Sequence, residues 1–285
     1  MPQLTWLITG CSSGFGETLA RSILARGDKA IATARGPEIR LGALVEAGAK
    51  TYSLDVTGSQ KSTTALFEQI VEENGAIDVL VNNAGYIHGG IAEELSIKDY
   101  VAQFETNFFG TVKCTHAILP HFRARKAGTI VFMGSMGGIT GAVGAGPYCA
   151  SKFALEGFYE CLKQEIAHLN IQTLIFEPGL HRSKIMHPEN LRFKKSGDVG
   201  DYDALRDGVA EYLENINGKQ PGDPEKAVRI IIDVVKGEGV AEGKEKPERL
   251  PIGEDALDDM TKKYTAGLKI CQDWEATIGH TEFDE

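Results

Sequence analysis

Residues 9–16 read Thr9-Gly10-Cys11-Ser12-Ser13-Gly14-Phe15-Gly16, directly after the short apolar run from Leu4 to Thr9. Glycine allows the sharp turns and the close backbone approach that a phosphate group requires, and the free N–H groups at the start of a helix attract anions. Because an amphipathic stretch with Leu19, Ile23 and Leu24 follows, the segment predicts a strand, a phosphate-binding loop and a helix. The residues expected to contact a dinucleotide here are Gly10, Ser12, Ser13, Gly14, Phe15 and Gly16.

Short apolar runs alternate with amphipathic stretches along the first 180 residues, which predicts an α/β fold with a parallel sheet covered on both faces. The candidate strands, each expected to be buried, are Leu4 to Thr9, Lys29 to Ala34, Thr51 to Leu54, Val79 to Val81, Gly128 to Met133 and Ile171 to Phe176. Leu250 to Ile252 is a candidate edge strand. In a doubly wound sheet, ligands bind outside the carboxyl ends of the strands. We therefore expect one domain over residues 1–285, with its functional residues at that edge.

Composition excludes several classes of protein. Apolar residues make up 42% and charged residues 25%, as in ordinary globular chains, and the net charge of −10 disfavours nucleic acid as a partner. No apolar run approaches the roughly 18 residues of a membrane span, and the N-terminus lacks the pattern of a signal peptide. The five cysteines form no CxxC pair, which favours reduced thiols, a cytoplasmic location and no metal site.

The second half of the chain contains a lid and a tail. Residues 180–222 are polar, punctuated by glycines and carry scattered aromatic residues, which predicts a partly helical lid. Asp223-Pro224-Glu225 is typical of a helix start, and that helix is expected to run to about Val235. The tail, about residues 254–280, repeats an apolar residue every three or four positions, which predicts a helix. We expect its apolar stripe to dock on its own subunit, with a contact between subunits as the alternative.

The second strand ends in Ala32-Thr33-Ala34-Arg35. An acid at this place would bind the 2′-hydroxyl of an adenosine ribose and repel a 2′-phosphate, whereas a guanidinium suits a phosphate. Arg35 therefore predicts NADP(H), with Ser12 and Ser13 as further donors. NAD(H), with Arg35 as a solvated surface charge, is the alternative.

Two further segments end strands at the same edge. Asp55-Val56 follows the third candidate strand, and Asp55 is expected to accept a hydrogen bond from the adenine amino group. Asn82-Asn83-Ala84-Gly85 follows the fourth, where Ala84 and Gly85 would let backbone lie against the adenosine and an Asn amide would join neighbouring strands. Ordinary turn chemistry is the alternative for each position alone.

Tyr148 and Lys152 lie four residues apart, hence on one face of a helix. A nearby ammonium stabilises phenolate and is expected to lower the tyrosine pKa from about 10, which makes Tyr148 a candidate general acid–base. Tyr159 and Lys163 share this spacing. Position separates the two pairs, because the helix after Gly128 to Met133 starts near the cofactor edge and takes Tyr159 about 16 Å farther away. We therefore expect Tyr159 to be an exposed or packing residue.

Ser135 and Asn107 complete the candidate site. Ser135 follows the strand from Gly128 to Met133, where its hydroxyl would hold a substrate oxygen while Tyr148 donates a proton. Asn107 falls inside a helical pattern from about Lys98 to Arg125, where asparagine has low propensity. One hypothesis is that it holds a water that relays protons to Lys152. From the residues alone, an asparagine on the helix surface is the favoured interpretation.

The combination resembles the short-chain dehydrogenase/reductase family over about residues 3–253. The matching elements are Thr9-Gly10-x3-Gly14-x-Gly16, Asp55, Asn82-Asn83-Ala84-Gly85, Asn107, Ser135, Tyr148-x3-Lys152 and Pro178-Gly179. The resemblance implies a Rossmann domain with a seven-stranded sheet, Leu250 to Ile252 supplying the last strand. It also implies an Asn107-Ser135-Tyr148-Lys152 tetrad in which Lys152 binds the nicotinamide ribose. Family members often form a homodimer or homotetramer through the helices that carry Asn107 and Tyr148.

Family members commonly carry a threonine after Pro178-Gly179 that contacts the nicotinamide carboxamide, and Ser183 stands at that place here. This segment and Arg35 are similar to those of 17β-hydroxysteroid dehydrogenase-like and retinol dehydrogenase-like reductases. The expected activity is therefore NADPH-dependent reduction of a carbonyl on a bulky apolar molecule, with Tyr148 as proton donor. The alternatives are an NADP-dependent alcohol or hydroxysteroid dehydrogenase working oxidatively, and a non-catalytic NADP-binding regulatory protein. Substrate contacts are expected from residues 86–90, 136–145 and 180–212.

Overall fold

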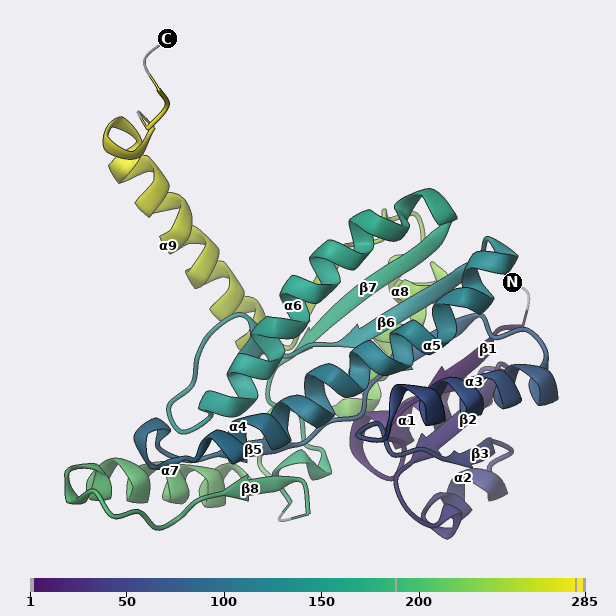
Figure 1. Cartoon of the computed structure of the whole chain (residues 1–285), viewed down its shortest axis with the longest axis horizontal. Helices are drawn as coiled ribbons and strands as arrows, with labels where there is room; N and C mark the ends of the chain where they lie inside the picture. The colour runs from purple at the N-terminus through teal and green to yellow at the C-terminus, as the bar shows by residue number, and fades with distance from the viewer. Residues whose placement is uncertain (1–2, 188, 280, 284–285) are drawn as a thin grey trace.

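The computed structural model describes residues 3–187, 189–279 and 281–283. Its centre is a seven-stranded parallel sheet in the order β3-β2-β1-β4-β6-β7-β9 (Figure 1). Its strands are β1 (Thr5–Ile8), β2 (Lys29–Ala34), β3 (Lys50–Ser53), β4 (Val79–Asn82), β6 (Gly128–Met133), β7 (Ile171–Pro178) and β9 (Arg249–Ile252). The order runs outward from β1 in one direction and from β4 in the other, so the topological switch point lies between them. The predicted doubly wound sheet is confirmed.

Helices cover both faces of this sheet. The helices of the described chain are α1 (Gly14–Ala25), α2 (Gly42–Glu46), α3 (Gln60–Asn74), α4 (Ile97–Phe104), α5 (Gly110–Arg125), α6 (Gly146–Ile166), α7 (Asp203–Ile216), α8 (Pro224–Lys236) and α9 (Glu254–Ile278), of which α7 belongs to the lid and α9 projects from the body. Because side chains alternate along a strand, Trp6 and Ile8 pack with α1 and α8, whereas Leu7 packs with α3, α5 and α6. The sheet is thus buried between two apolar layers.

The expected strands agree with the structure except for the burial of the third. β3 lies at the edge of the sheet, and its terminal residues Lys50 and Ser53 are exposed. The sequence does not reveal this, because strand order places β3 outside β2. Asp223 caps α8 as predicted, since its Oδ1 accepts hydrogen bonds from the backbone of Glu225 and Lys226 at 2.8 and 3.4 Å.

The lid is anchored to the body at two places. A two-stranded parallel sheet pairs β5 (Ile87–Gly89) with β8 (Leu191–Phe193), and α7 follows beside it (Figure 1). Arg206 of α7 donates to both carboxylate oxygens of Glu94, at 3.1 and 2.6 Å. Both side chains are nearly inaccessible to solvent. In this conformation the lid is therefore held in place against the body by the β5–β8 pairing and by the Arg206–Glu94 ion pair.

The terminal helix α9 differs from expectation, because it projects away from the body (Figure 1). Its first three turns contact the subunit: Asp259 accepts a hydrogen bond from the Thr140 hydroxyl at 3.2 Å, and Lys263 lies 4.4 Å from the centre of the Phe153 ring. Farther along the helix, apolar side chains are more than half exposed, namely Leu268, Ile270, Trp274 and Ile278. The prediction that the whole stripe docks on its own subunit is wrong, because α9 runs away from the sheet and leaves the outer part of its stripe exposed.

Candidate active site

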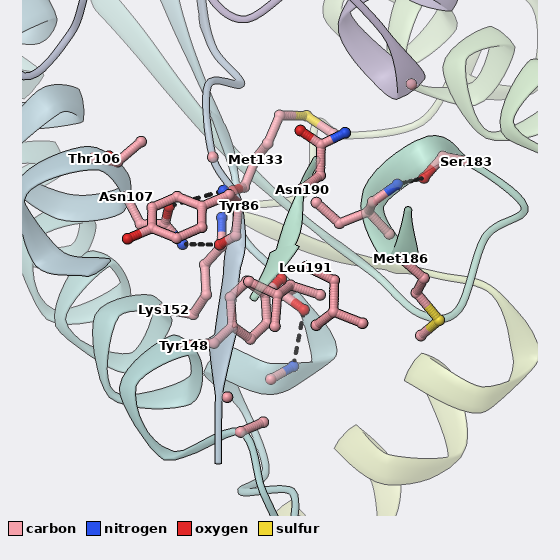
Figure 2. Close-up of a pocket in the computed structure, with 18 of the residues that line it drawn as sticks. Tyr86, Thr106, Asn107, Met133, Tyr148, Lys152, Ser183, Met186, Asn190 and Leu191 are labelled. Atoms are coloured by element: carbon pink, nitrogen blue, oxygen red, sulfur yellow. Dashed lines mark hydrogen bonds between the residues drawn. The ribbon is translucent and has the colours of Figure 1, made fainter. Parts of the chain in front are cut away.

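A cavity of about 770 Å³ opens at the carboxyl edge of the sheet. It is lined by Gly10, Ser12, Ser13, Gly14, Phe15, Arg35, Asp55, Val56, Asn83, Ala84, Gly85, Asn107, Ser135, Tyr148, Lys152, Pro178, Gly179 and Ser183. The structure thus brings together every predicted site residue except Gly16. Figure 2 shows Tyr148, Lys152 and Asn107 on one side of the cavity, with Met186 and Leu191 across from them.

The glycine loop has the shape that a dinucleotide diphosphate requires. Gly10 has a φ of +72°, and a Cβ on it would lie 2.7 Å from the Cα of Ala84. Among the residues that the structure describes, no side chain caps the start of α1, so its first N–H groups face the cavity free. Gly16 is packed beneath the loop, because its Cβ would lie 2.5 Å from both Asn83 Nδ2 and the carbonyl oxygen of Gly10. The prediction that Gly16 lines the cofactor site is therefore wrong, because Gly16 packs against Asn83 and Gly10 beneath the loop.

Hydrogen bonds fix the loop against the end of β4. The Thr9 hydroxyl accepts from the backbone N–H groups of Asn83 and Ala84 at 2.9 and 3.0 Å. The Asn83 side chain donates back to the carbonyl oxygens of Thr9 and Gly10 at 2.8 and 3.1 Å. Asn83 thus joins the two strand ends in the way that the sequence suggested for an asparagine amide.

Two guanidinium groups lie at the adenosine end of the cavity. Arg35 lines it as predicted, and so does Arg40, which sequence reasoning missed. A 3₁₀ turn, Glu38–Leu41, brings Arg40 back so that its Nη1 donates to the carbonyl oxygen of Arg35 at 2.9 Å. The sequence does not predict that Arg40 lies beside Arg35, because the path of the loop between them cannot be inferred from the number of residues in it.

Asp55 and Val56 lie beside this corner. Asp55 Oδ1 accepts hydrogen bonds from the backbone and the hydroxyl of Thr57, at 2.9 and 2.7 Å. This is an Asx turn, which leaves Oδ2 for a ligand. Val56 packs closely against Gly110, where a Cβ would lie 2.8 Å from its side chain.

Lys152 and Tyr148 lie on successive turns of α6, with the ammonium 5.9 Å from the centre of the phenol ring. Lys152 Nζ donates to the carbonyl oxygen of Met133 at 2.6 Å. Burial lowers the pKa of Lys152 to about 8, an effect that Glu156 opposes. Burial raises the pKa of Tyr148 to about 12, although a hydrogen bond with Ser135 acts in the opposite direction. The expected lowering of the tyrosine pKa is therefore wrong for this structure, because the lysine faces Met133 and burial of the phenol dominates.

Ser135 is buried at the end of β6 and begins the 3₁₀ turn Met136–Gly138. Its hydroxyl accepts a hydrogen bond from the backbone N–H of Gly137 at 3.0 Å. A Cβ on Gly137 would lie 3.1 Å from the Tyr148 ring and 3.4 Å from the Ser135 hydroxyl, so both groups meet at this glycine. The two hydroxyls face one cavity and can contact the same substrate oxygen.

Asn107 lies in a π-helical turn, Glu105–Phe109, which joins α4 to α5. Such turns often occur at functional sites. The residue is buried, so the interpretation as a surface asparagine is wrong. Its side chain bonds both backbone groups of Tyr86 at 3.1 Å and donates to the Ser151 hydroxyl at 3.3 Å. Asn107 thereby fixes Tyr86 in the wall of the cavity.

The segment after β7 crosses the glycine loop. Gly179 donates its N–H to the carbonyl oxygen of Ile252 at 2.9 Å, and Ser183 begins the 3₁₀ turn Lys184–Met186. A Cβ on Gly14 would lie 3.6 Å from the side chain of Ser183, so the two loops meet over the cavity. The Phe15 and His181 rings pack at 5.2 Å between the same two loops.

The far side of the cavity is largely apolar, as the predicted substrate regions suggested. Its wall includes Tyr86, Ile87, Met136, Ala142, Val143, Met186, Leu191, Phe193, Val209, Tyr212 and Leu213. Leu213 lies just beyond the predicted segments. Sequence reasoning also missed Met133, whose carbonyl anchors Lys152, because a backbone acceptor has no signature in side-chain patterns. Arg192 adds a cation at the rim, 5.0 Å from the centre of the Tyr86 ring.

Comparison with known proteins identifies the family. The family model for short chain dehydrogenases matches residues 5–192. Oxidoreductase BOA17 of Botryotinia fuckeliana is 36% identical over 89% of this chain and 90% of its own, and the uncharacterized oxidoreductase YusZ of Bacillus subtilis is 34% identical over 87% and 88%. Human retinol dehydrogenase 8 is 40% identical over 61% of this chain and 58% of its own. The chain therefore belongs to the short-chain dehydrogenase/reductase family, and it is an oxidoreductase of that family.

Solved structures agree with this assignment. A short-chain dehydrogenase from Streptomyces avermitilis has a TM-score of 0.85 and 34% identity, with 99% of this chain and all of that chain covered. A serine dehydrogenase complexed with NADP+ has a TM-score of 0.69 and 28% identity, with 87% and 94% covered. Enzymes of this family use nicotinamide cofactors, and the cradle formed by Gly10, Ala84 and the start of α1 fits the diphosphate of such a molecule.

Within the described ranges, no helix is long and apolar enough to cross a lipid bilayer. The same residues contain no group of three or more His, Cys, Asp or Glu side chains placed to hold a metal ion.

Proposed function

We propose that this protein reduces the carbonyl group of a bulky, largely apolar ketone or aldehyde to an alcohol with NADPH. When bound, the nicotinamide supplies the hydride. Ser135 holds the carbonyl oxygen by a hydrogen bond, and Tyr148 donates the proton that the oxygen takes up. Lys152 holds the nicotinamide ribose and returns a proton to Tyr148. Asn107 positions Tyr86 and, through water, supports that relay.

One observation carries the proposal: the Tyr148 phenol and the Ser135 hydroxyl meet at Gly137 inside a cavity whose other wall is apolar. A half-buried phenol with a pKa of about 12 stays protonated at neutral pH, so it suits the role of acid in reduction. The test is a panel of ketones, aldehydes and quinones of increasing apolar bulk, followed by NADPH oxidation. We expect kcat/KM to rise with apolar bulk. No turnover across the panel, despite tight NADPH binding, would favour a non-catalytic regulatory protein.

Cofactor preference provides a second prediction, because Arg35 and Arg40 both line the cavity near the end of β2 and a guanidinium there suits a 2′-phosphate. Arg35→Asp is expected to shift the ratio of kcat/KM for NADPH over NADH by about 100-fold towards NADH, since a charged hydrogen bond contributes about 1.5–3 kcal/mol. Arg40→Ala is expected to shift it about tenfold. The matched control is Arg21→Asp, an exposed charge on α1 that bonds Glu17 outside the cavity. Unchanged selectivity in Arg35→Asp would instead support NAD(H) as an equal cofactor.

The oxidative alternative predicts a different dependence on pH. Alcohol oxidation needs the Tyr148 phenolate, and a pKa of about 12 means that its fraction grows about tenfold per pH unit below that value. Oxidation with NADP+ is therefore expected to rise between pH 7 and 9, by up to about tenfold per unit. Reduction is expected to stay level and then fall near pH 8, where Lys152 loses its proton. Initial rates in both directions over pH 6–10 check this, and an oxidation rate independent of pH would contradict the role of Tyr148.

We also propose a homodimer or homotetramer in the cytoplasm. Phe109, at the end of the π-helical turn that holds Asn107, and Phe153, on α6 with Tyr148, are 44% and 40% exposed. The outer half of α9 presents a further apolar surface. Such exposed apolar groups are typical of subunit contacts. Sedimentation velocity gives the assembly, and fluorescence microscopy of a fusion protein gives the location.

A further inference from the structure

Two glutamates are buried next to the catalytic lysine, and neither lines the cavity. Glu156 lies one helical turn after Lys152 on α6 and is 7% exposed. Glu177 lies at the end of β7, immediately before Pro178-Gly179, and is 0% exposed. Carboxylates are almost never this buried unless they are paired. Neither the fold nor the mechanism described above uses this pair.

The pair has too few donors for two full negative charges. All four carboxyl oxygens are buried, and no backbone N–H or neutral side chain of the described residues donates a hydrogen bond to them. The two carboxyls lie within hydrogen-bonding reach of each other. The Arg249 guanidinium lies 3.2 Å from Glu156 and 3.7 Å from Glu177, but it also donates to Glu160 at 2.8 Å and to the Tyr264 hydroxyl. Two buried carboxylates facing one shared guanidinium cannot both ionise at low cost, so they hold a proton between them.

The pair lies beside three parts of the active site. A Cβ on Gly134 or Gly138 would lie 3.0 or 3.2 Å from Glu156 Oε1, so this carboxyl packs against both glycines that flank the Ser135 turn. Lys152 lies one turn before Glu156, and Glu177 adjoins the cofactor loop at Pro178.

The charged groups that face Glu156 come from three elements. They are Lys152 of its own helix, Glu177 of β7 and Arg249 of β9, whereas Gly134 and Gly138 present only backbone. Burial raises the pKa of both glutamates, and Glu177 raises that of Glu156 further. The negative charge of Glu156 in turn raises the pKa of Lys152 against the effect of burial.

We propose that Glu156, sharing one proton with Glu177, is a positioning residue that stabilises the ammonium of Lys152 and fixes the turn that carries Ser135. It acts through Lys152 and Ser135 and does not touch the substrate. This inference rests on the proposed function, because it concerns the lysine that serves the reduction.

The experiment compares Glu156→Gln and Glu177→Gln, which keep the side-chain volume and remove the charge. In Glu156→Gln, the pH at which kcat falls on the alkaline side, here called the alkaline limb, is expected to decrease by at least half a unit. As a result, kcat at pH 9 is expected to fall about three- to tenfold, while kcat at pH 6 stays within twofold. In Glu177→Gln, the charge settles on Glu156, so the limb moves to higher pH. A purely structural role would not produce shifts of opposite sign.

Two controls separate this inference from simple damage to the fold. Glu160→Gln also loses a contact with Arg249, but Glu160 is mostly exposed, so the limb is expected to stay in place. Glu156→Asp keeps the charge and is expected to restore most of the limb. The same shifts should appear without turnover, as the pH midpoint of NADPH binding followed by fluorescence.

The outcomes distinguish the two proposals. A parent protein that reduces no carbonyl contradicts the proposed function, and the binding midpoint then still tests Glu156. If the parent protein is active but the alkaline limb does not move in either Gln variant, the role of Glu156 is overturned and the proposed function stands. If Glu156→Gln fails to fold, Glu177→Gln serves as the test. A shift of its alkaline limb to higher pH supports the inference, and the absence of that shift overturns it.

Discussion

Replacement of Tyr148 by phenylalanine is expected to lower kcat for carbonyl reduction by at least about 1,000-fold, while the Kd for NADPH stays within about threefold. Phenylalanine keeps the ring that packs against Gly137 but removes the hydroxyl that donates the proton in the proposed mechanism. Ser135 keeps its hydrogen bond from Gly137, and in the proposed mechanism it holds the substrate oxygen without supplying the proton. Single-turnover reduction in the stopped flow measures the loss directly, because it excludes product release.

The matched control is Tyr159→Phe, which changes the second tyrosine of α6 that precedes a lysine by four residues. Tyr159 is buried, and its hydroxyl donates to the carbonyl oxygen of Glu248 at 2.5 Å. Losing that bond is expected to cost about 1 kcal/mol of the free energy of unfolding and to leave kcat within twofold. A Tyr148→Phe variant that keeps more than a tenth of the parent rate would show that another group supplies the proton.

The fold was predictable because each strand carries its signal locally. Apolar runs such as Val79 to Val81 require burial on both faces, and the glycine loop after β1 fixes where the sheet meets its ligand. The position of Tyr148 followed from the same logic, since a helix after a parallel strand begins at the ligand edge. The third strand shows the limit, because burial depends on strand order, and order is a property of the whole sheet.

The features of the site that residue spacing did not predict, including the contacts of residues it did name, depend on contacts between distant segments. Asn107 has low helix propensity, yet nothing in its neighbours predicts the π-helical turn that directs it to Tyr86. The pKa of Tyr148 depends on its burial and on the direction of the Lys152 side chain, which a hydrogen bond to the carbonyl oxygen of Met133 fixes. Arg40 joins Arg35 only through the return of a 3₁₀ turn. Each of these is a tertiary effect that residue spacing along the chain does not record.

Replacement of Gly10 by alanine is expected to raise the Kd for NADPH by about 100-fold and to lower the free energy of unfolding by about 2–4 kcal/mol. The φ of +72° strains any side chain at this position, and the new Cβ would lie 2.7 Å from the Cα of Ala84. Ala84 cannot move aside, because the Thr9 hydroxyl holds its N–H and that of Asn83. The loop must therefore shift by about 1 Å to reach ordinary contact distance, which carries its backbone into the space for the diphosphate.

Gly27→Ala is a control that separates the backbone strain of a positive φ from the steric contact with Ala84. Gly27 has a φ of +83°, similar to that of Gly10, but a Cβ there meets no atom of the described chain within 4 Å. This variant is expected to lose about 1–2 kcal/mol of the free energy of unfolding through strain alone and to bind NADPH as the parent does. Calorimetric titration with NADPH and urea unfolding of both variants give the two quantities independently. If Gly10→Ala bound NADPH within threefold of Gly27→Ala, the close approach to Ala84 would have no part in forming the cofactor site, and the diphosphate would have to lie elsewhere along the edge of the sheet.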